Sequence, residues 1–277
     1  MGALTPAFRR PAQSVCLALP RLVLHRLDWP PPGLPIVLLH PNRTNARVWD
    51  FVVEHSTLPN RFIAPDARGH GLSDYPAQGY GYDDYLDDLR ALFDALRLGP
   101  VHLVGAATGG NLALLLASQD PARVASLTVV DPGLSLDPAI SHAVREQMVR
   151  EFRFESQAEA RARMPFSQHW SDAMKDHYSR HSFRSLDDGQ VEWRYFPPGV
   201  VATEAMLEAP IWDRIQVRCP TLMVRGALSA VFPRAMSDRL CALIPGAQQA
   251  EVEADHRVSQ DNPQALAALL DGFIGRL

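Results

Sequence analysis

A glycine-framed turn in the middle of the sequence could hold a reactive side chain. Residues 100–117 read as a short apolar strand, a sharp turn and a buried helix, and the turn is Gly105-Ala106-Ala107-Thr108-Gly109. A strand-to-helix turn of this kind exposes its central side chain beyond the end of the strand, where a nucleophile can reach a substrate. The central residue here is Ala107, which carries only a methyl group. The frame therefore indicates nucleophilic catalysis, but the nucleophile is missing.

Two other residues have types suited to the same chemistry. A hydroxyl nucleophile needs a general base, usually histidine, that a carboxylate orients. His256 lies between the last expected strand and the last expected helix, and Asp131 directly follows a strand expected at residues 124–130. The hydroxyl of Thr108 could replace the missing one only if the frame shifted by one residue, which the flanking glycines disfavour.

Composition limits the classes of protein to consider. The chain has 277 residues, of which 47% are hydrophobic and 21% charged, as in ordinary globular proteins. The net charge of −4 argues against nucleic acid or an anionic membrane as partner. No apolar run reaches the roughly 18 residues of a membrane helix. Cys16, Cys219 and Cys241 follow no disulfide or zinc pattern, so we expect reduced thiols and a cytoplasmic location.

Expected strands alternate with expected helices along most of the chain. The strands are expected at residues 22–29, 34–39, 61–65, 101–104, 124–130, 221–224 and 248–253. Residues 30–33 predict a hairpin-like turn between the first two strands, and residues 44–54 have helical spacing. Asp83 is expected to cap one helix, and Asn262, followed by Pro263, to cap the last. This order predicts an α/β fold with a mostly parallel central sheet and helices on both faces.

Residues 135–210 interrupt the alternation. They read as helical pieces rich in aromatic residues, among them Phe166, Trp170 and Trp193. An insertion after the strand that ends at Asp131 leaves from the carboxyl edge of the sheet, where ligands bind in such folds. We therefore expect a core formed by residues 1–134 and 211–277, and a helical cap at 135–210 whose three named aromatics line an apolar pocket.

Four segments in the correct order resemble the α/β-hydrolase superfamily, in its large group with a helical cap. They are Leu38-Leu39-His40-Pro41-Asn42, Asp66-Ala67-Arg68-Gly69-His70-Gly71, the turn at 105–109, and Ala254-Asp255-His256. The resemblance implies the α/β-hydrolase fold, with Ala107 at the position of the nucleophile and His256 as general base. It also implies that His40 and His70 are structural.

The resemblance also guides the choice of acid. Many relatives carry it shortly after the strand at 221–224, where this chain has Ser229 and Ala230; others carry it at the position of Asp131. We therefore expect the Asp131 carboxylate within hydrogen-bond distance of His256, roughly 2.6–3.2 Å. Asp255 is the less favoured alternative, since adjacent side chains usually diverge.

The same resemblance implies an oxyanion hole, the pair of backbone N–H groups that stabilises the negative oxygen of a tetrahedral intermediate. Its donors would be the N–H groups of Asn42 and Thr108. Pro41 stands where the family has glycine and has no N–H of its own.

The function expected first is hydrolysis of a small, uncharged, apolar or aromatic ester or lactone by a Ser-His-acid mechanism, in a form impaired by alanine at position 107. A second hypothesis is a naturally serine-less member that binds a ligand or uses His256 as a lyase or isomerase. A third is a non-catalytic structural protein. No metal-ligand cluster or glycine-rich nucleotide loop is visible, so no metal and no cofactor are expected. The sequence does not indicate an oligomeric state.

Overall fold

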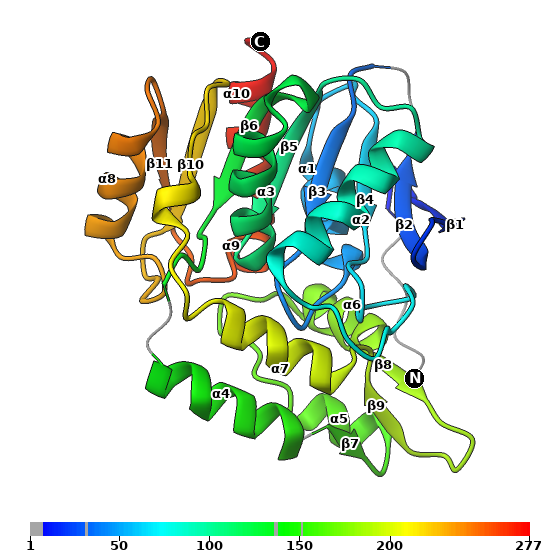
Figure 1. Ribbon diagram of the computed structural model, residues 1–277. Coiled ribbons are helices and arrows are strands. Elements are labelled where there is room, and N and C mark those ends of the chain that lie inside the picture. The colour runs from blue at the N-terminus through cyan, green and yellow to red at the C-terminus, as the bar shows by residue number, and fades with distance from the viewer. Residues whose placement is uncertain (1–7, 31–32, 136–137, 151) are drawn as a thin grey trace.

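An eight-stranded sheet forms the centre of the computed structural model, which describes residues 8–30, 33–135, 138–150 and 152–277 (Figure 1). Its strand order is β1-β2-β4-β3-β5-β6-β10-β11. The strands are β1 (Gln13–Ala18), β2 (Val23–Trp29), β3 (Ile36–Leu39), β4 (Phe62–Pro65), β5 (Val101–Ala106), β6 (Val124–Val130), β10 (Thr221–Gly226) and β11 (Gln248–Val252). Strand β2 is antiparallel to β1 and β4, and the other neighbours are parallel. The predicted, mostly parallel sheet is confirmed.

Helices cover both faces of this sheet, as predicted (Figure 1). One face packs against α2 (Tyr82–Ala95), α3 (Thr108–Gln119) and α8 (Arg234–Leu243), and the other against α1 (Asp50–His55), α9 (Val258–Asp261) and α10 (Pro263–Ile274). Strands β3 and β5 are buried at every position. Their continuous apolar runs follow from this two-sided cover. In the described ranges, no helix is both long and apolar enough to cross a membrane.

Residues 138–150 and 152–206 form a separate layer across one end of the sheet (Figure 1), which we call the cap. Its helices are α4 (Pro138–Arg150), α5 (Gln157–Ala162), α6 (Asp172–Ser182) and α7 (Pro197–Met206). It also contains a small antiparallel sheet of β7 (Arg153–Phe154), β8 (Phe183–Ser185) and β9 (Val191–Trp193), in the order β7-β9-β8. The sequence indicated the helices but not these three strands.

Several local expectations were wrong. The turn at residues 30–33 does not join a hairpin, because β4 lies between β2 and β3; Pro31 and Pro32 themselves are outside the described residues. The helix expected at 44–54 is divided into a 3-10 helix, Ala46–Trp49, and α1. Two further 3-10 helices lie at Pro121–Arg123 and Trp212–Arg214.

Of the two helix caps predicted from the sequence, one is wrong and one is confirmed. Asp83 does not cap α2: Gly81 holds that position, and its N–H donates to the Asp84 carboxylate at 3.2 Å. Asn262 caps α10 as expected, since its side chain accepts the N–H of Ala265 at 3.1 Å and Pro263 is the first helical residue.

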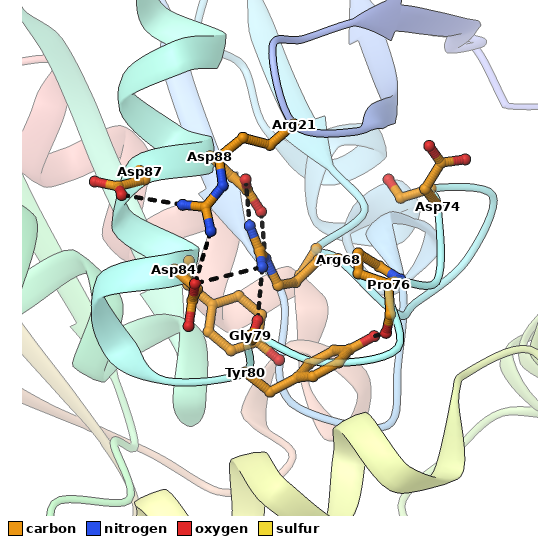
Figure 2. A network of polar contacts seen from close by, with 12 residues as sticks. Arg21, Arg68, Asp74, Pro76, Gly79, Tyr80, Asp84, Asp87 and Asp88 are labelled. Carbon is orange, nitrogen blue, oxygen red and sulfur yellow. Dashed lines mark hydrogen bonds and ion pairs between the residues drawn. The ribbon is translucent and has the colours of Figure 1, made fainter.

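A buried ion pair fixes the turn after β4 to α2 (Figure 2). The Arg68 guanidinium donates to both carboxylate oxygens of Asp88 at 2.6 Å, and to the Gly79 carbonyl at 2.6 Å. Both charged side chains are almost fully buried. Nearer the surface, Arg21 pairs with Asp84 and Asp87. The network holds the loop that carries His70 against the sheet.

Replacing Asp88 by asparagine should strongly destabilise the protein. Asp88→Asn leaves the buried Arg68 charge without its carboxylate, and breaking a buried pair in this way typically costs about 3–5 kcal/mol of unfolding free energy. Urea titrations followed by circular dichroism would measure the loss. The neighbouring Asp87 is half-exposed, so Asp87→Asn is the matched control and should cost no more than about 0.5 kcal/mol. Equal losses for the two variants would mean that the Arg68 pair does not fix this turn.

Candidate active site

The carboxyl ends of the parallel strands bring the predicted residues to one edge of the sheet. Asn42 lies just beyond β3, Ala107 directly follows β5, Asp131 directly follows β6, and His256 lies in the loop after β11. In the β5–β6 ladder, Ala106 is opposite Val130, so Ala107 and Asp131 leave neighbouring strands side by side. Ligand sites of open α/β sheets form at this edge.

Tight backbone contacts fix the turn at Ala107. A Cβ atom on Gly109 would lie 2.4 Å from the Leu39 carbonyl oxygen, and one on Gly105 would lie 2.1 Å from the Gly109 carbonyl oxygen. Strand β3, the turn and α3 can approach this closely only because both residues are glycine. Ala107 is at the apex, with φ 49° and ψ −118°. The turn has the geometry that presents a nucleophile, but it presents a methyl group.

Backbone strain is concentrated around this edge. In the described part of the chain, the non-glycine residues with positive φ are Arg43 (63°), Arg97 (51°), Ala107 (49°) and Asp131 (45°). Three of the four are in the loops after β3, β5 and β6. Each such conformation costs about 1–3 kcal/mol and persists only where the surroundings impose it, which is typical of functional sites.

His256 faces a buried carboxylate. Its Nδ1 lies 3.5 Å from Oδ2 of Asp131, whose side chain is fully buried, while the imidazole is 29% exposed. Among the described residues, neither Asp131 oxygen has a hydrogen-bond partner. The separation exceeds the expected 2.6–3.2 Å, and His256 Nδ1 has no hydrogen-bond partner among the described residues, so the two groups are adjacent but the predicted hydrogen bond is not formed. The role of Asp131 as the acid stays a prediction. A carboxylate in this position can orient the imidazole and stabilise its protonated form.

The other candidate for the acid is directed elsewhere. The Asp255 carboxylate accepts the backbone N–H of His256 at 2.7 Å, so it braces the loop instead of facing the ring. Ser229, at the position where many relatives have a carboxylate, is buried, and its hydroxyl accepts the N–H of Phe232 at 3.3 Å.

Two backbone N–H groups at the site are free to bind a ligand. Neither the Asn42 nor the Thr108 N–H donates a hydrogen bond to any described residue. Thr108 is the first residue of α3, where backbone N–H groups have no partner within the helix and carry partial positive charge. An oxyanion hole requires two such free N–H groups beside the nucleophile position, which Ala107 occupies here.

A buried carboxylate of the cap holds the side chain of Asn42. The Asn42 amide donates to Oε1 of Glu204 at 2.8 Å, and Glu204 on α7 is only 6% exposed. This contact joins the cap to the loop after β3. The sequence offered no signal for it, because Glu204 is 162 residues further along the chain and lies in an unremarkable helix.

His40 and His70 brace the neighbouring loops. His40 accepts the Ala67 N–H at Nε2 (2.9 Å), and His70 accepts the Arg43 N–H at Nε2 (3.2 Å). Their Nδ1 atoms donate to the carbonyls of Pro41 and Arg68 respectively. Burial lowers the pKa of His70 to about 3 and also lowers the pKa of His40. Both are therefore neutral at pH 7, and these contacts suit the structural role expected for them.

The three aromatic residues expected to line the pocket lie in two different parts of the cap. Trp170 is buried, and its Nε1 donates to Asp261 at 2.7 Å, which joins the cap to α9, just after His256. The Phe166 ring lies 5.7 Å from that of Trp170. The centre of the Trp193 ring lies 4.4 Å from that of the Phe183 ring, within the cap itself. That they line a substrate pocket stays a prediction.

One cavity lies between the cap and the loop after β4. It has a volume of about 360 Å³, and its lining includes Ser73, Tyr75, Arg184 and Arg194. None of the predicted pocket residues lines it, so it does not test the pocket expected at Ala107.

Comparisons with known proteins agree with the fold. A family model described as the alpha/beta hydrolase fold matches residues 35–263. The chain is 30% identical over 262 residues to "Lipase LipV" of Mycobacterium tuberculosis, covering 91% of this chain and 98% of that protein. It is 25% identical to "Serine hydrolase-like protein" of Danio rerio, covering 98% and 90% of the two chains.

Solved structures show the same architecture. A crystal structure of E-2-(acetamidomethylene)succinate hydrolase is similar with a TM-score of 0.85 at 24% identity, covering 96% of this chain and 100% of that one. The enol-lactonase from Burkholderia xenovorans gives a TM-score of 0.75 at 19% identity, covering 94% and 100%. With the family model and the mycobacterial relative, these findings establish that the chain belongs to the α/β-hydrolase superfamily.

Proposed function

We propose that this protein has the site of a Ser-His-acid hydrolase for an ester or lactone, with alanine at the nucleophile position. The observation that carries the proposal is the strained turn at Ala107, placed beside the pair of His256 and Asp131. Two free N–H groups, of Asn42 and Thr108, supply the remaining part of such a site. In this form the protein binds substrate and turns it over poorly or not at all.

The reaction with serine at position 107 would run in two halves. The hydroxyl oxygen attacks the carbonyl carbon while His256 takes its proton, and the two N–H groups stabilise the resulting oxyanion. His256 then gives the proton to the leaving alkoxide, and an acyl-enzyme forms. In the second half, water attacks the acyl carbon while His256 takes its proton, and His256 returns that proton to the serine oxygen as the acid leaves. The Asp131 carboxylate stabilises the imidazolium in both halves.

An apolar acyl group is the substrate we propose, because the cap is rich in aromatic side chains. The names of similar proteins support an ester or lactone bond, since they include a lipase and an enol-lactonase. In this proposal the segment at residues 135–210 is the lid, the rest of the chain is the hydrolase core, and the pocket lies between them with Ala107 at its floor. Excluding water there would strengthen every electrostatic interaction in the site.

One observation favours a second function. Ala107 itself would be native in a serine-less member of the superfamily, in which His256 and Asp131 still form an acid–base pair and the free N–H groups still stabilise an enolate or another anion. Such a protein would be a lyase, an isomerase or a ligand-binding protein.

A complex with a non-reactive ester analogue tests the location of the site. The analogue's carbonyl oxygen should lie within about 2.7–3.1 Å of the N–H groups of Asn42 and Thr108 in a crystal structure of the complex. Trp170 and Trp193 should change fluorescence on binding if they line the lid. A ligand bound away from the carboxyl edge of the sheet would contradict both the lid and the oxyanion hole.

A further inference from the structure

Two arginines adjoin the candidate catalytic groups in sequence. Arg43 directly follows the proposed oxyanion donor Asn42, and Arg257 directly follows His256. Neither forms an ion pair with a carboxylate in the described part of the chain. Arg153 of the cap differs, since it pairs with Glu192 at 3.0 Å.

The conformation of Arg43 is the first sign of a specific role. Its φ of 63° puts it in the left-handed region, which is strained for a side chain of this size. The backbone N–H of Arg43 is held by His70 at 3.2 Å, and its side chain is exposed although the residues on either side of the loop are largely covered. The backbone of Arg43 is therefore held in this conformation directly after Asn42, and its charged side chain is accessible.

Arg257 is fixed by different means. Its guanidinium lies 5.0 Å from the centre of the Trp170 ring, and Trp170 is itself held by Asp261. A guanidinium stacked on an aromatic face keeps its N–H groups free in the plane of the group, where they can bind a carboxylate at two points.

The loops that carry the two arginines both contact helix α6 of the cap. The Asn45 amide, two residues after Arg43, donates to the His181 carbonyl at 2.9 Å. The Trp170 ring, against which Arg257 lies, has its centre 5.0 Å from that of Tyr178 on the same helix. Burial raises the pKa of Tyr178, and the nearby charges of Arg257 and Arg43 oppose that rise. Arg43 also opposes the burial-induced rise in the pKa of Tyr195. Loops that are more than 200 residues apart in sequence thus direct unpaired positive charge to one region under the cap.

We propose that Arg43 and Arg257 together bind a carboxylate of the substrate, so that the ester or lactone cleaved at this site is part of a monoanion. This inference rests on the proposed function and narrows its substrate class: the apolar acyl chain ends in an acid group. Two guanidiniums, one beside the oxyanion donor and one beside the base, would fix the distance from the carboxylate to the reacting carbonyl.

Binding can be tested with the protein as it stands, because Ala107 allows an ester to bind without turnover. Monomethyl glutarate and dimethyl glutarate share a chain and an ester group, and differ in one free carboxylate. Isothermal titration calorimetry should show the monoester binding at least about tenfold more tightly, the advantage of a charge-assisted contact over a neutral one. Equal affinity for the two esters, or no binding of the monoester, would overturn the inference.

Arginine variants test which side chains supply the positive charge that binds the carboxylate. Arg43→Gln and Arg257→Gln should each remove most of the monoester's advantage over dimethyl glutarate. Arg257→Lys keeps the positive charge and should retain part of the monoester's advantage. The matched control is Arg97→Gln: Arg97 is also exposed with positive φ (51°), but it lies between α2 and β5, at the opposite edge of the sheet. A monoester advantage that survives both glutamine variants would also overturn the inference.

Turnover separates this inference from the proposed function. If an Ala107→Ser variant hydrolyses both glutarate esters without preference, the hydrolase proposal stands and the carboxylate site fails. If the monoester binds with the expected discrimination but the serine variant cleaves neither ester, the carboxylate site stands and the hydrolase proposal fails.

Discussion

An Ala107→Ser variant should hydrolyse 4-nitrophenyl acetate about 10⁶ times faster than the unchanged protein, because loss of a triad nucleophile costs about this factor in turnover. The turn already holds its apex residue at φ 49°, and the substitution adds one oxygen atom without changing the backbone. Release of 4-nitrophenolate, followed by absorbance, gives the rate, and a burst equal to the enzyme concentration would identify the acyl-enzyme.

Two further variants show where the new activity comes from. In the serine background, His256→Ala should return the rate to that of the unchanged protein, because the hydroxyl loses its base. Thr108→Ala should preserve the activity, since the Thr108 backbone N–H remains. A folded Ala107→Ser variant with no rate above buffer would contradict the hydrolase proposal and favour the serine-less function.

The acid should have the second largest effect. In the Ala107→Ser background, Asp131→Asn should lower kcat by about 10⁴, the cost of an asparagine that cannot stabilise the imidazolium and favours the wrong tautomer. The substitution conserves shape at a fully buried position, so KM should change little. The measurement is the same ester assay, with thermal melting to confirm folding.

Asp255→Asn is the matched control for that experiment. The Asp255 side chain accepts the backbone N–H of His256, and an asparagine oxygen can accept the same hydrogen bond. Its kcat should therefore stay close to that of the serine parent. If Asp255→Asn lost as much activity as Asp131→Asn, the acid would be assigned to the wrong residue.

The sequence predicted the central strands well because they are buried on both faces. The run at residues 124–130 coincides with β6, and β5 was found with the turn that follows it. The sequence predicted the outer strands of the sheet poorly. Strand β1 was missed because it lies at the sheet edge and has no fully buried residue, and the hairpin expected at residues 30–33 failed because β2 pairs with β4 instead. Which strands become neighbours depends on contacts between distant segments.

The candidate site divides in the same way. Ala107, Asp131 and His256 could be named because short motifs at strand ends carry them. The contact of Glu204 with Asn42 could not be recognised, because it spans 162 residues. The left-handed backbone of Arg43 could not be recognised either, because no residue pattern encodes it. Glycine would have marked a left-handed position, but arginine gives no such signal.

The strained turn at Ala107 has a consequence for redesign. A methyl group gains nothing from being presented to a substrate, yet the residue keeps a conformation that costs about 1–3 kcal/mol. The backbone conformation of the turn is thus imposed by β5, α3 and the close approach of the Leu39 carbonyl to Gly109, and not by the side chain at position 107. A cysteine or an aspartate at position 107 would therefore leave the backbone at the same place and in the same direction as a serine. The choice of reactive group in this protein is therefore separable from the folding of its scaffold.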